Sequence, residues 1–70
     1  MKKKVEIDFG ESKYLFMFMR AVNQIETAMN MPNTSIRPVD ETHVVIEGNV
    51  DPLFLIQVGM RYGELLRNYV

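Results

Sequence analysis

The sequence predicts a single small α+β domain over residues 1–70, with the element order β-α-β-β-α. Two observations predict this class. Apolar residues alternate with polar ones in short segments and recur at helical spacing in two longer segments. A chain of 70 residues, 47% hydrophobic and 24% charged, has the composition of a globular protein but room for only one hydrophobic core.

Residues 4–9 alternate between charged and apolar side chains, which predicts the first strand. Successive side chains of a strand point to opposite faces. Val5, Ile7 and Phe9 are therefore expected on a buried face, with the charged residues on an exposed one. Gly10 interrupts the pattern and ends the strand.

The first helix is predicted to begin at about Ser12 and to end near Asn30. Its end follows from Pro32, because a proline disfavours helical angles at the residue before it. Helical spacing places the apolar residues on one broad arc, with polar residues opposite. The arc comprises Tyr14, Leu15, Phe18, Met19, Ala21, Val22, Ile25, Ala28 and Met29.

Two further strands are predicted at about residues 35–38 and 42–47, joined by a turn. Pro38 has no amide hydrogen to donate, which places the shorter strand at an edge of the sheet. Alternation then assigns the faces. The inward residues are Ile36, Val44 and Ile46, and the outward ones are His43, Val45 and Glu47.

Asp51 followed by Pro52 predicts the start of the second helix. The Asp51 carboxylate is suited to accept an amide of the first turn, and Pro52 supplies a preset φ where no amide donor is needed. The helix runs close to the C-terminus. Its main apolar face comprises Phe54, Leu55, Val58, Tyr62, Leu65, Leu66 and Tyr69.

This element order favours a two-layer sandwich: a three-stranded sheet in the order first, third, second, with both helices on one face. The arrangement resembles the ferredoxin-like β-α-β-β-α-β topology with its last strand absent. The resemblance lies in element order alone and implies no function. It leaves the outer edge of the first strand without a neighbour.

Two sets of apolar residues project away from the predicted core faces. They are Phe16 and Met17 on the first helix, and Leu53, Ile56 and Met60 on the second. A helix on a three-stranded sheet can bury one face, not two, so these residues predict a contact with a second copy of the chain. The alternative is that they are ordinary surface residues, or that the helix phases are off by one residue.

Gly59 and Gly63 lie one turn apart in the second helix and form a flat strip beside its outward apolar residues, Leu53, Ile56 and Met60. Such a strip allows close approach of another helix, either the first helix of the same chain or a helix of a second copy. The first strand offers a different contact. Its edge is either guarded by the charges of residues 2–4 or paired antiparallel with a second copy into a six-stranded sheet.

His43 is the only histidine. If the third strand runs antiparallel beside the first, its solvent face brings His43 close to Glu6, Asp8 and Glu47. Asp8, His43 and Glu47 are then weak candidates for a metal site, although a solvated strand face explains them equally well. No triad, phosphate loop or cysteine site is present, so we expect neither a catalytic site nor a cofactor.

A net charge of -1 gives no positive field for nucleic acid or anionic lipid. Glu6 and Asp8 break the apolar stretch that a secretory signal would need after the lysines of residues 2–4, and the longest apolar run, residues 14–19, is too short to cross a bilayer. We therefore expect a cytoplasmic, non-enzymatic protein-protein interaction module that acts as a homodimer. The alternative is a small-molecule-binding or regulatory domain with its pocket at the subunit interface.

Overall fold

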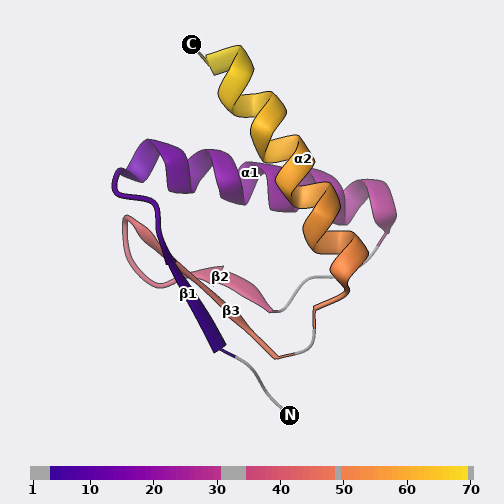
Figure 1. Ribbon diagram of the computed structural model, residues 1–70, viewed down its shortest axis with the longest axis horizontal. Helices are drawn as coiled ribbons and strands as arrows, with labels where there is room; N and C mark the ends of the chain where they lie inside the picture. The colour runs from indigo at the N-terminus through magenta and orange to yellow at the C-terminus, as the bar shows by residue number, and fades with distance from the viewer. Residues whose placement is uncertain (1–3, 31–34, 49, 70) are drawn as a thin grey trace.

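The computed structural model describes residues 4–30, 35–48 and 50–69 and has the predicted element order, β-α-β-β-α (Figure 1). The lysines at positions 2 and 3 and the predicted turn at residues 31–34 lie outside the described residues. Each predicted element is present, within one residue of its expected start. The elements are β1 (Lys4–Asp8), α1 (Ser12–Met29), β2 (Ile36–Pro38), β3 (His43–Glu47) and α2 (Pro52–Tyr69).

The three strands form one sheet in the predicted order β1-β3-β2, and β3 pairs antiparallel with both neighbours. In this register Asp8 lies opposite His43, and Lys4 lies opposite Glu47. Pro38 is on the edge strand β2, where its missing amide costs no ladder bond. The α+β class and the strand order are therefore confirmed.

Helix α1 begins and ends through specific backbone conformations. Gly10 turns the chain from β1 into the helix at φ 80°, and its amide donates to Asp8 Oδ1 at 2.8 Å. At the other end Asn30 adopts the left-handed conformation, with φ 53°, and its amide donates to the carbonyls of Glu26 and Thr27. Asparagine is one of the few non-glycine residues that tolerates these angles, which explains why the helix ends there.

The predicted start of α2 is also confirmed. Asp51 Oδ1 accepts the amide of Leu53 at 2.9 Å, and the Asp51 carbonyl accepts the amide of Leu55 at 3.1 Å. The carboxylate therefore satisfies an amide that has no partner within the helix.

The core lies between the sheet and the two helices. Its most deeply buried large side chains are Val22 of α1, Val44 of β3 and Val58 of α2, so the sheet and both helices contribute to it. The ring of Phe9, just after β1, lies 5.1 Å from that of Phe18 and 5.8 Å from that of Tyr62 between centroids. These aromatic contacts join the end of β1 to both helices.

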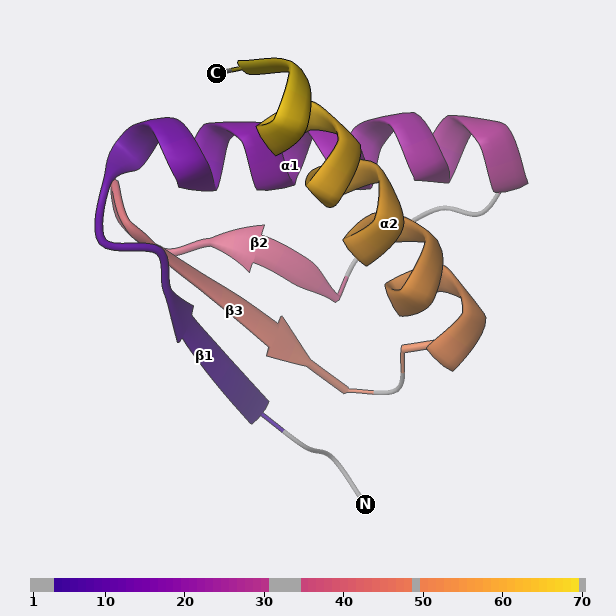
Figure 2. The ribbon, with the colours of Figure 1, turned by 45° about the horizontal axis from the view of Figure 1, so that its top comes forward.

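The two helices cross each other steeply instead of lying parallel on the sheet (Figure 1, Figure 2). Helix α2 packs most extensively against α1, and α1 contacts β2 more than β1. At the crossing Ala21 is fully buried, and Arg61 of α2 donates from Nε to Gln24 Oε1 of α1. A small residue at this position lets the helix backbones approach closely. The expected two-layer, ferredoxin-like arrangement is therefore met only loosely.

Two strand residues differ from their predicted exposure. Val45 points to the outer face of the sheet, as expected, but is buried instead of exposed. Its neighbours across the sheet are Glu6 and Arg37, whose long aliphatic stems can cover a valine while their charged ends reach water. Val5 was expected to be buried but is 50% exposed, because β1 lies at the edge that the helices cover least.

Candidate functional site

Helix α2 carries apolar side chains on its outward face as well as on its core face. Leu53, Ile56 and Met60 are 53%, 57% and 59% exposed, and their predicted outward position is confirmed. We call these three residues the α2 apolar surface. From residue 52 to residue 63 the helix has one charged residue, Arg61, and this residue is turned towards α1. A helix that is apolar all round is typically buried, and this one is buried on one side only.

Gly59 and Gly63 lie in the same outward part of α2. Both are exposed, and a Cβ atom added at either position would meet nothing within 4 Å. The interpretation that these glycines pack against α1 is therefore wrong, because that side of α2 is occupied by longer side chains such as Arg61. The glycines leave a flat strip of backbone beside the α2 apolar surface, open to solvent.

The two predicted contact residues of α1 differ from each other. Phe16 is exposed, as expected, but the prediction for Met17 is wrong, because Met17 is only 7% exposed. The physical reason is the direction from which α2 crosses. Met17 lies one helical turn before Ala21 and two turns before Gln24, to which Arg61 of α2 donates. It also lines a groove together with Leu65 of α2. Met17 therefore belongs to the packing between the helices and not to the exposed set.

The helix crossing leaves an open groove on each of its two sides. One groove, of about 620 Å³, has Phe16 and Met17 on α1 and Leu65 on α2 among its lining residues. The other, of about 750 Å³, is lined in part by Met60. Arg20 borders both grooves, so Phe16 and the α2 apolar surface belong to adjoining regions. Sequence reasoning missed Arg20 and Leu65, since their role depends on where the helices cross.

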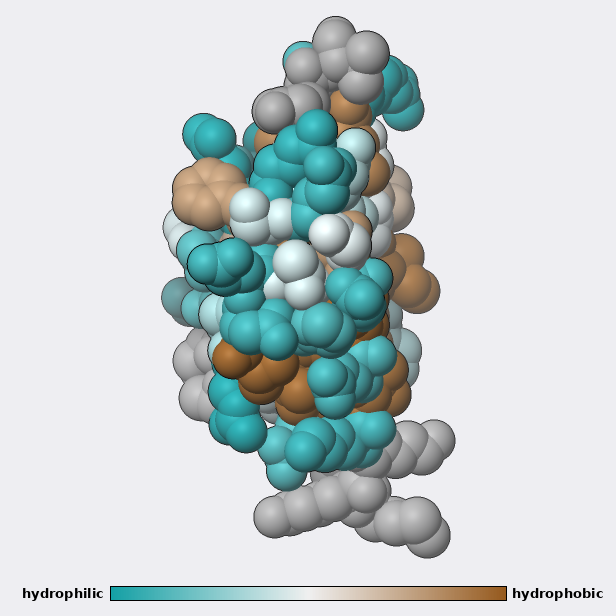
Figure 3. All heavy atoms as spheres, turned by 90° about the vertical axis from the view of Figure 1, so that its left-hand side faces the viewer, coloured by the Kyte–Doolittle hydropathy of each residue, from teal (hydrophilic) through white to brown (hydrophobic). Residues whose placement is uncertain are grey.

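The surface seen from the side where α1 begins is mainly hydrophilic, with apolar side chains visible between the polar ones (Figure 3). Val39, in the turn between β2 and β3, is 51% exposed. Single exposed apolar residues of this kind are normal on a protein surface. The α2 apolar surface is different because its members are contiguous along one helix and lie beside a strip without side chains.

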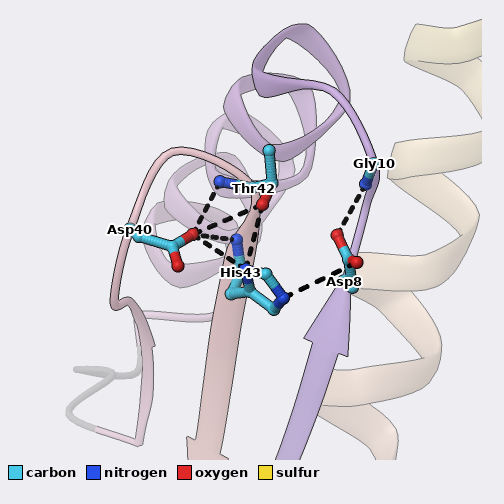
Figure 4. A network of polar contacts seen from close by, with 5 residues as sticks. All are labelled: Asp8, Gly10, Asp40, Thr42 and His43. Carbon is cyan, nitrogen blue, oxygen red and sulfur yellow. Dashed lines mark hydrogen bonds and ion pairs between the residues drawn. The ribbon is translucent and has the colours of Figure 1, made fainter.

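A polar network surrounds His43 at the end of the sheet (Figure 4). Nδ1 of His43 lies 2.9 Å from Asp40 Oδ1, and Nε2 lies 3.6 Å from Asp8 Oδ2. Asp40 Oδ1 also accepts the backbone amides of Thr42 and His43, each at 2.8 Å. Asp40 therefore closes the β2-β3 turn, a role typical of aspartate in turns. The sequence predicted the turn and the approach of His43 to Asp8 but missed Asp40 as a partner of the imidazole.

The two carboxylates set the charge of this network. Hydrogen bonds from Thr42 and His43 lower the pKa of Asp40 to about 2. The hydrogen bond that His43 donates to Asp40, together with the negative charges of Asp40, Asp8 and Glu6, raises the pKa of His43 above its usual value of 6.5. The charged imidazolium is thus favoured between Asp40 on one side and Asp8 on the other.

The weak metal candidates are not brought together. Asp8 and His43 are neighbours, but Glu47 lies at the other end of β3, where its Oε2 accepts from Arg37 Nη2 at 3.1 Å. Within residues 4–30, 35–48 and 50–69, no group of three or more acidic or histidine side chains is placed to hold a metal ion. The arrangement around His43 instead links the β2-β3 turn to the end of β1.

Comparison of the chain with known protein families, curated proteins and solved structures found no match. In the part of the chain that the structure describes, neither helix combines the length and apolar character needed to span a membrane. The fold and the exposed surface together define a small α+β domain with an uncovered apolar helix face.

Proposed function

We propose that this chain is a non-enzymatic protein-protein interaction module that acts as a homodimer in the cytoplasm, through the outward face of α2. The observation that carries this proposal is the exposure of Leu53, Ile56 and Met60 on a helix whose opposite face is already buried in the core. Full burial of such a side chain is worth roughly 1.5–3 kcal/mol, and more than half of each of the three is still exposed, so covering them is a substantial gain beside the stability of a small domain.

The pattern on α2 also suits a second copy of the same helix. Consider two antiparallel α2 helices related by a two-fold axis that passes between Gly59 and Met60. Ile56 of one copy then lies opposite Gly63 of the other, and Met60 lies opposite Gly59. Ile56 and Met60 thus each face a glycine of the other copy, which leaves room for their side chains. The two-fold axis repeats both contacts.

Solution mass tests this proposal. We expect light scattering after size-exclusion chromatography to give a mass of at least two copies for the wild type. The double variant Ile56→Glu/Met60→Glu should lose the α2 contact, so that its mass falls by half or more, because four charges would face an apolar strip. Val39→Glu is the matched control, since Val39 is similarly exposed but lies in the β2-β3 turn. A wild type that stays a single copy at high concentration, or a double variant of unchanged mass, would contradict the proposal.

A small-molecule or regulatory role is the second candidate, and the groove beside Phe16 favours it. Its volume of about 620 Å³ falls in the range of ligand pockets, and Met17 and Leu65 give it apolar walls next to the cationic Arg20. The proposal would place an apolar anion there, at the boundary between two copies. Native mass spectra that retain a bound small molecule, lost in the variant Leu65→Asp, would support this role over the first.

A further inference from the structure

The outer edge of β1 presents regularly spaced backbone groups. The amide of Phe9 donates to the carbonyl of Thr42 at 2.8 Å, directly continuing the β1-β3 register. In an antiparallel ladder the bonded residues alternate, so Ile7 and Val5 also bond towards β3. The N-H and C=O groups of Lys4, Glu6 and Asp8 therefore point away from the sheet. In Figure 2, β1 is the outermost strand, on the opposite side of β3 from β2.

The side chains of this edge combine charged residues with an exposed apolar one. Val5 lies on the helix-facing side, opposite Ile46, yet is 50% exposed. On the other face Lys4 and Glu6 are exposed, and neither forms an ion pair with another described residue. The opposite edge differs, because β2 has three residues and ends in Pro38. An open edge with an exposed apolar residue can accept another strand.

We propose that β1 pairs antiparallel with β1 of a second copy across a two-fold axis at Val5, which joins the two sheets into one of six strands. The occupant is a second copy because the charges of this strand are self-complementary. With the axis at Val5, Lys4 lies opposite Glu6 of the second copy and Glu6 lies opposite its Lys4. Opposite charges directly across a ladder are stabilising.

The charges also select this register over its neighbours. An axis at Glu6 would place two Glu6 side chains against each other, although it would also place Lys4 opposite Asp8. An axis at Ile7 would place Glu6 against Asp8. Like charges directly opposite are destabilising. Asp8 is moreover already engaged, with its two oxygens near the Gly10 amide and His43 Nε2. The axis at Val5 pairs only opposite charges and covers both exposed valines.

This edge contact is separate from the α2 apolar surface and does not depend on it. The proposed α2 homodimer would then be the unit that the β1 contact joins further, into a closed tetramer or an open chain. The α2 contact and the β1 contact can therefore be broken one at a time.

Disulfide trapping tests the position of the axis. The chain has no cysteine, so Val5→Cys introduces a single thiol. Val5 and its counterpart would form a non-hydrogen-bonded pair, whose Cα separation of about 4.5 Å lies within the range of a disulfide. We expect Val5→Cys to form covalent dimers at least about tenfold faster than Val39→Cys, whose residue is equally exposed at 51%. Equal rates for the two variants would overturn the proposal.

A charge exchange tests the register. Lys4→Glu or Glu6→Lys alone places like charges opposite each other twice, and we expect either to weaken the edge contact about tenfold. The double variant Lys4→Glu/Glu6→Lys restores opposite charges and should restore the association. Glu41→Lys, in the exposed β2-β3 turn, controls for the change in net charge that Glu6→Lys makes.

Each measurement is repeated in the Ile56→Glu/Met60→Glu background, in which the α2 contact is removed. Disulfide trapping of the Val5→Cys variant and rescue by the double exchange should persist in this background, because the β1 pairing does not need the α2 contact. Circular dichroism confirms that each variant is folded. Folded single and double exchange variants that associate equally well, or equally poorly, would overturn the β1 pairing and leave the α2 proposal untouched.

Discussion

Nδ1 of His43 lies 2.9 Å from Oδ1 of Asp40, across the turn that joins β2 to β3. The same ring presents Nε2 to Asp8 Oδ2 at 3.6 Å, so one imidazole connects the turn to the end of β1. Asp8 in turn accepts the amide of Gly10, where the chain leaves the sheet for α1. The β2-β3 turn and the loop from β1 to α1 are thus connected through the imidazole of His43 (Figure 4).

Stability should fall as the pH rises through the pKa of folded His43. This pKa is raised above 6.5 by Asp40 and then by Asp8 and Glu6, so the folded state binds the proton more tightly than the unfolded state. The stabilisation is fully present below 6.5 and is lost as the pH passes the folded pKa. We expect the thermal midpoint of wild type to fall as the pH rises above about 6.5, and His43→Gln to lose most of this dependence.

Asp40 has the opposite dependence. Its pKa is lowered from 3.8 to about 2, so its contribution is present above 3.8 and is lost as the pH falls through about 2. Asp40→Asn should weaken both dependences, because it removes the acid-side titration of Asp40 and the main cause of the raised pKa of His43. A midpoint of Asp40→Asn that still falls with wild-type steepness above neutral pH would contradict this assignment.

Asp51→Ala should destabilise the chain by about 0.5–2 kcal/mol, because the amide of Leu53 loses its capping acceptor in the first turn. Urea denaturation followed by circular dichroism measures this change. Asp51→Asn keeps a side-chain oxygen at the same position and should cost much less. Equal losses for the two variants would show that the charge, and not the hydrogen bond, stabilises the start of α2.

Two phenylalanines, two residues apart on α1, should respond very differently to truncation. Phe18 is 8% exposed and packs against Phe9 and Tyr62, whereas Phe16 is 68% exposed. We expect Phe18→Ala to cost about 3–5 kcal/mol and Phe16→Ala to change the free energy of unfolding by less than about 0.5 kcal/mol in the single copy. If urea denaturation gave similar losses of unfolding free energy for the two variants, the assignment of Phe18 to the buried face of α1 and Phe16 to its exposed face would be wrong.

Gly63→Ala should stabilise a single copy by about 0.5–1 kcal/mol, because alanine favours the helix and its Cβ would meet no atom within 4 Å. The close helix approach expected from the sequence would make a larger residue here disrupt a helix contact. Because the space beside Gly63 is open within the chain, we assign that effect to the proposed contact between copies. In the Ile56→Glu/Met60→Glu background Gly63→Ala should raise the thermal midpoint. A lowered midpoint would mean that Gly63 packs within the chain.

Gly63→Leu separates folding from association. A leucine at this position fills the space that Ile56 of the second copy would occupy, so we expect the mass in light scattering to fall while the single copy stays folded. Gly63→Ala, with a much smaller side chain, is the matched control. An unchanged mass for Gly63→Leu would show that the glycine strip lies outside the contact.

The local signals were the most informative part of the sequence. Asp51 and Pro52 indicated the start of α2, and Pro32 indicated that α1 ends near Asn30, because helix ends depend on a few neighbouring residues. Strand alternation placed Asp8 and His43 on the same face of the sheet, whereas the antiparallel register that makes them neighbours was an assumption that the structure confirms. Asp40 was visible as a turn residue, but its hydrogen bond to the imidazole depends on how tightly the turn closes.

The sequence by itself determined the five elements, their order and the outward position of Leu53, Ile56 and Met60, because hydrophobic periodicity and capping act within one helix or strand. Only the tertiary structure decided that Met17 is buried and that Gly63 faces open space. Both depend on the side from which α2 crosses α1. That direction is set by packing the whole core, and no periodicity within either helix encodes it.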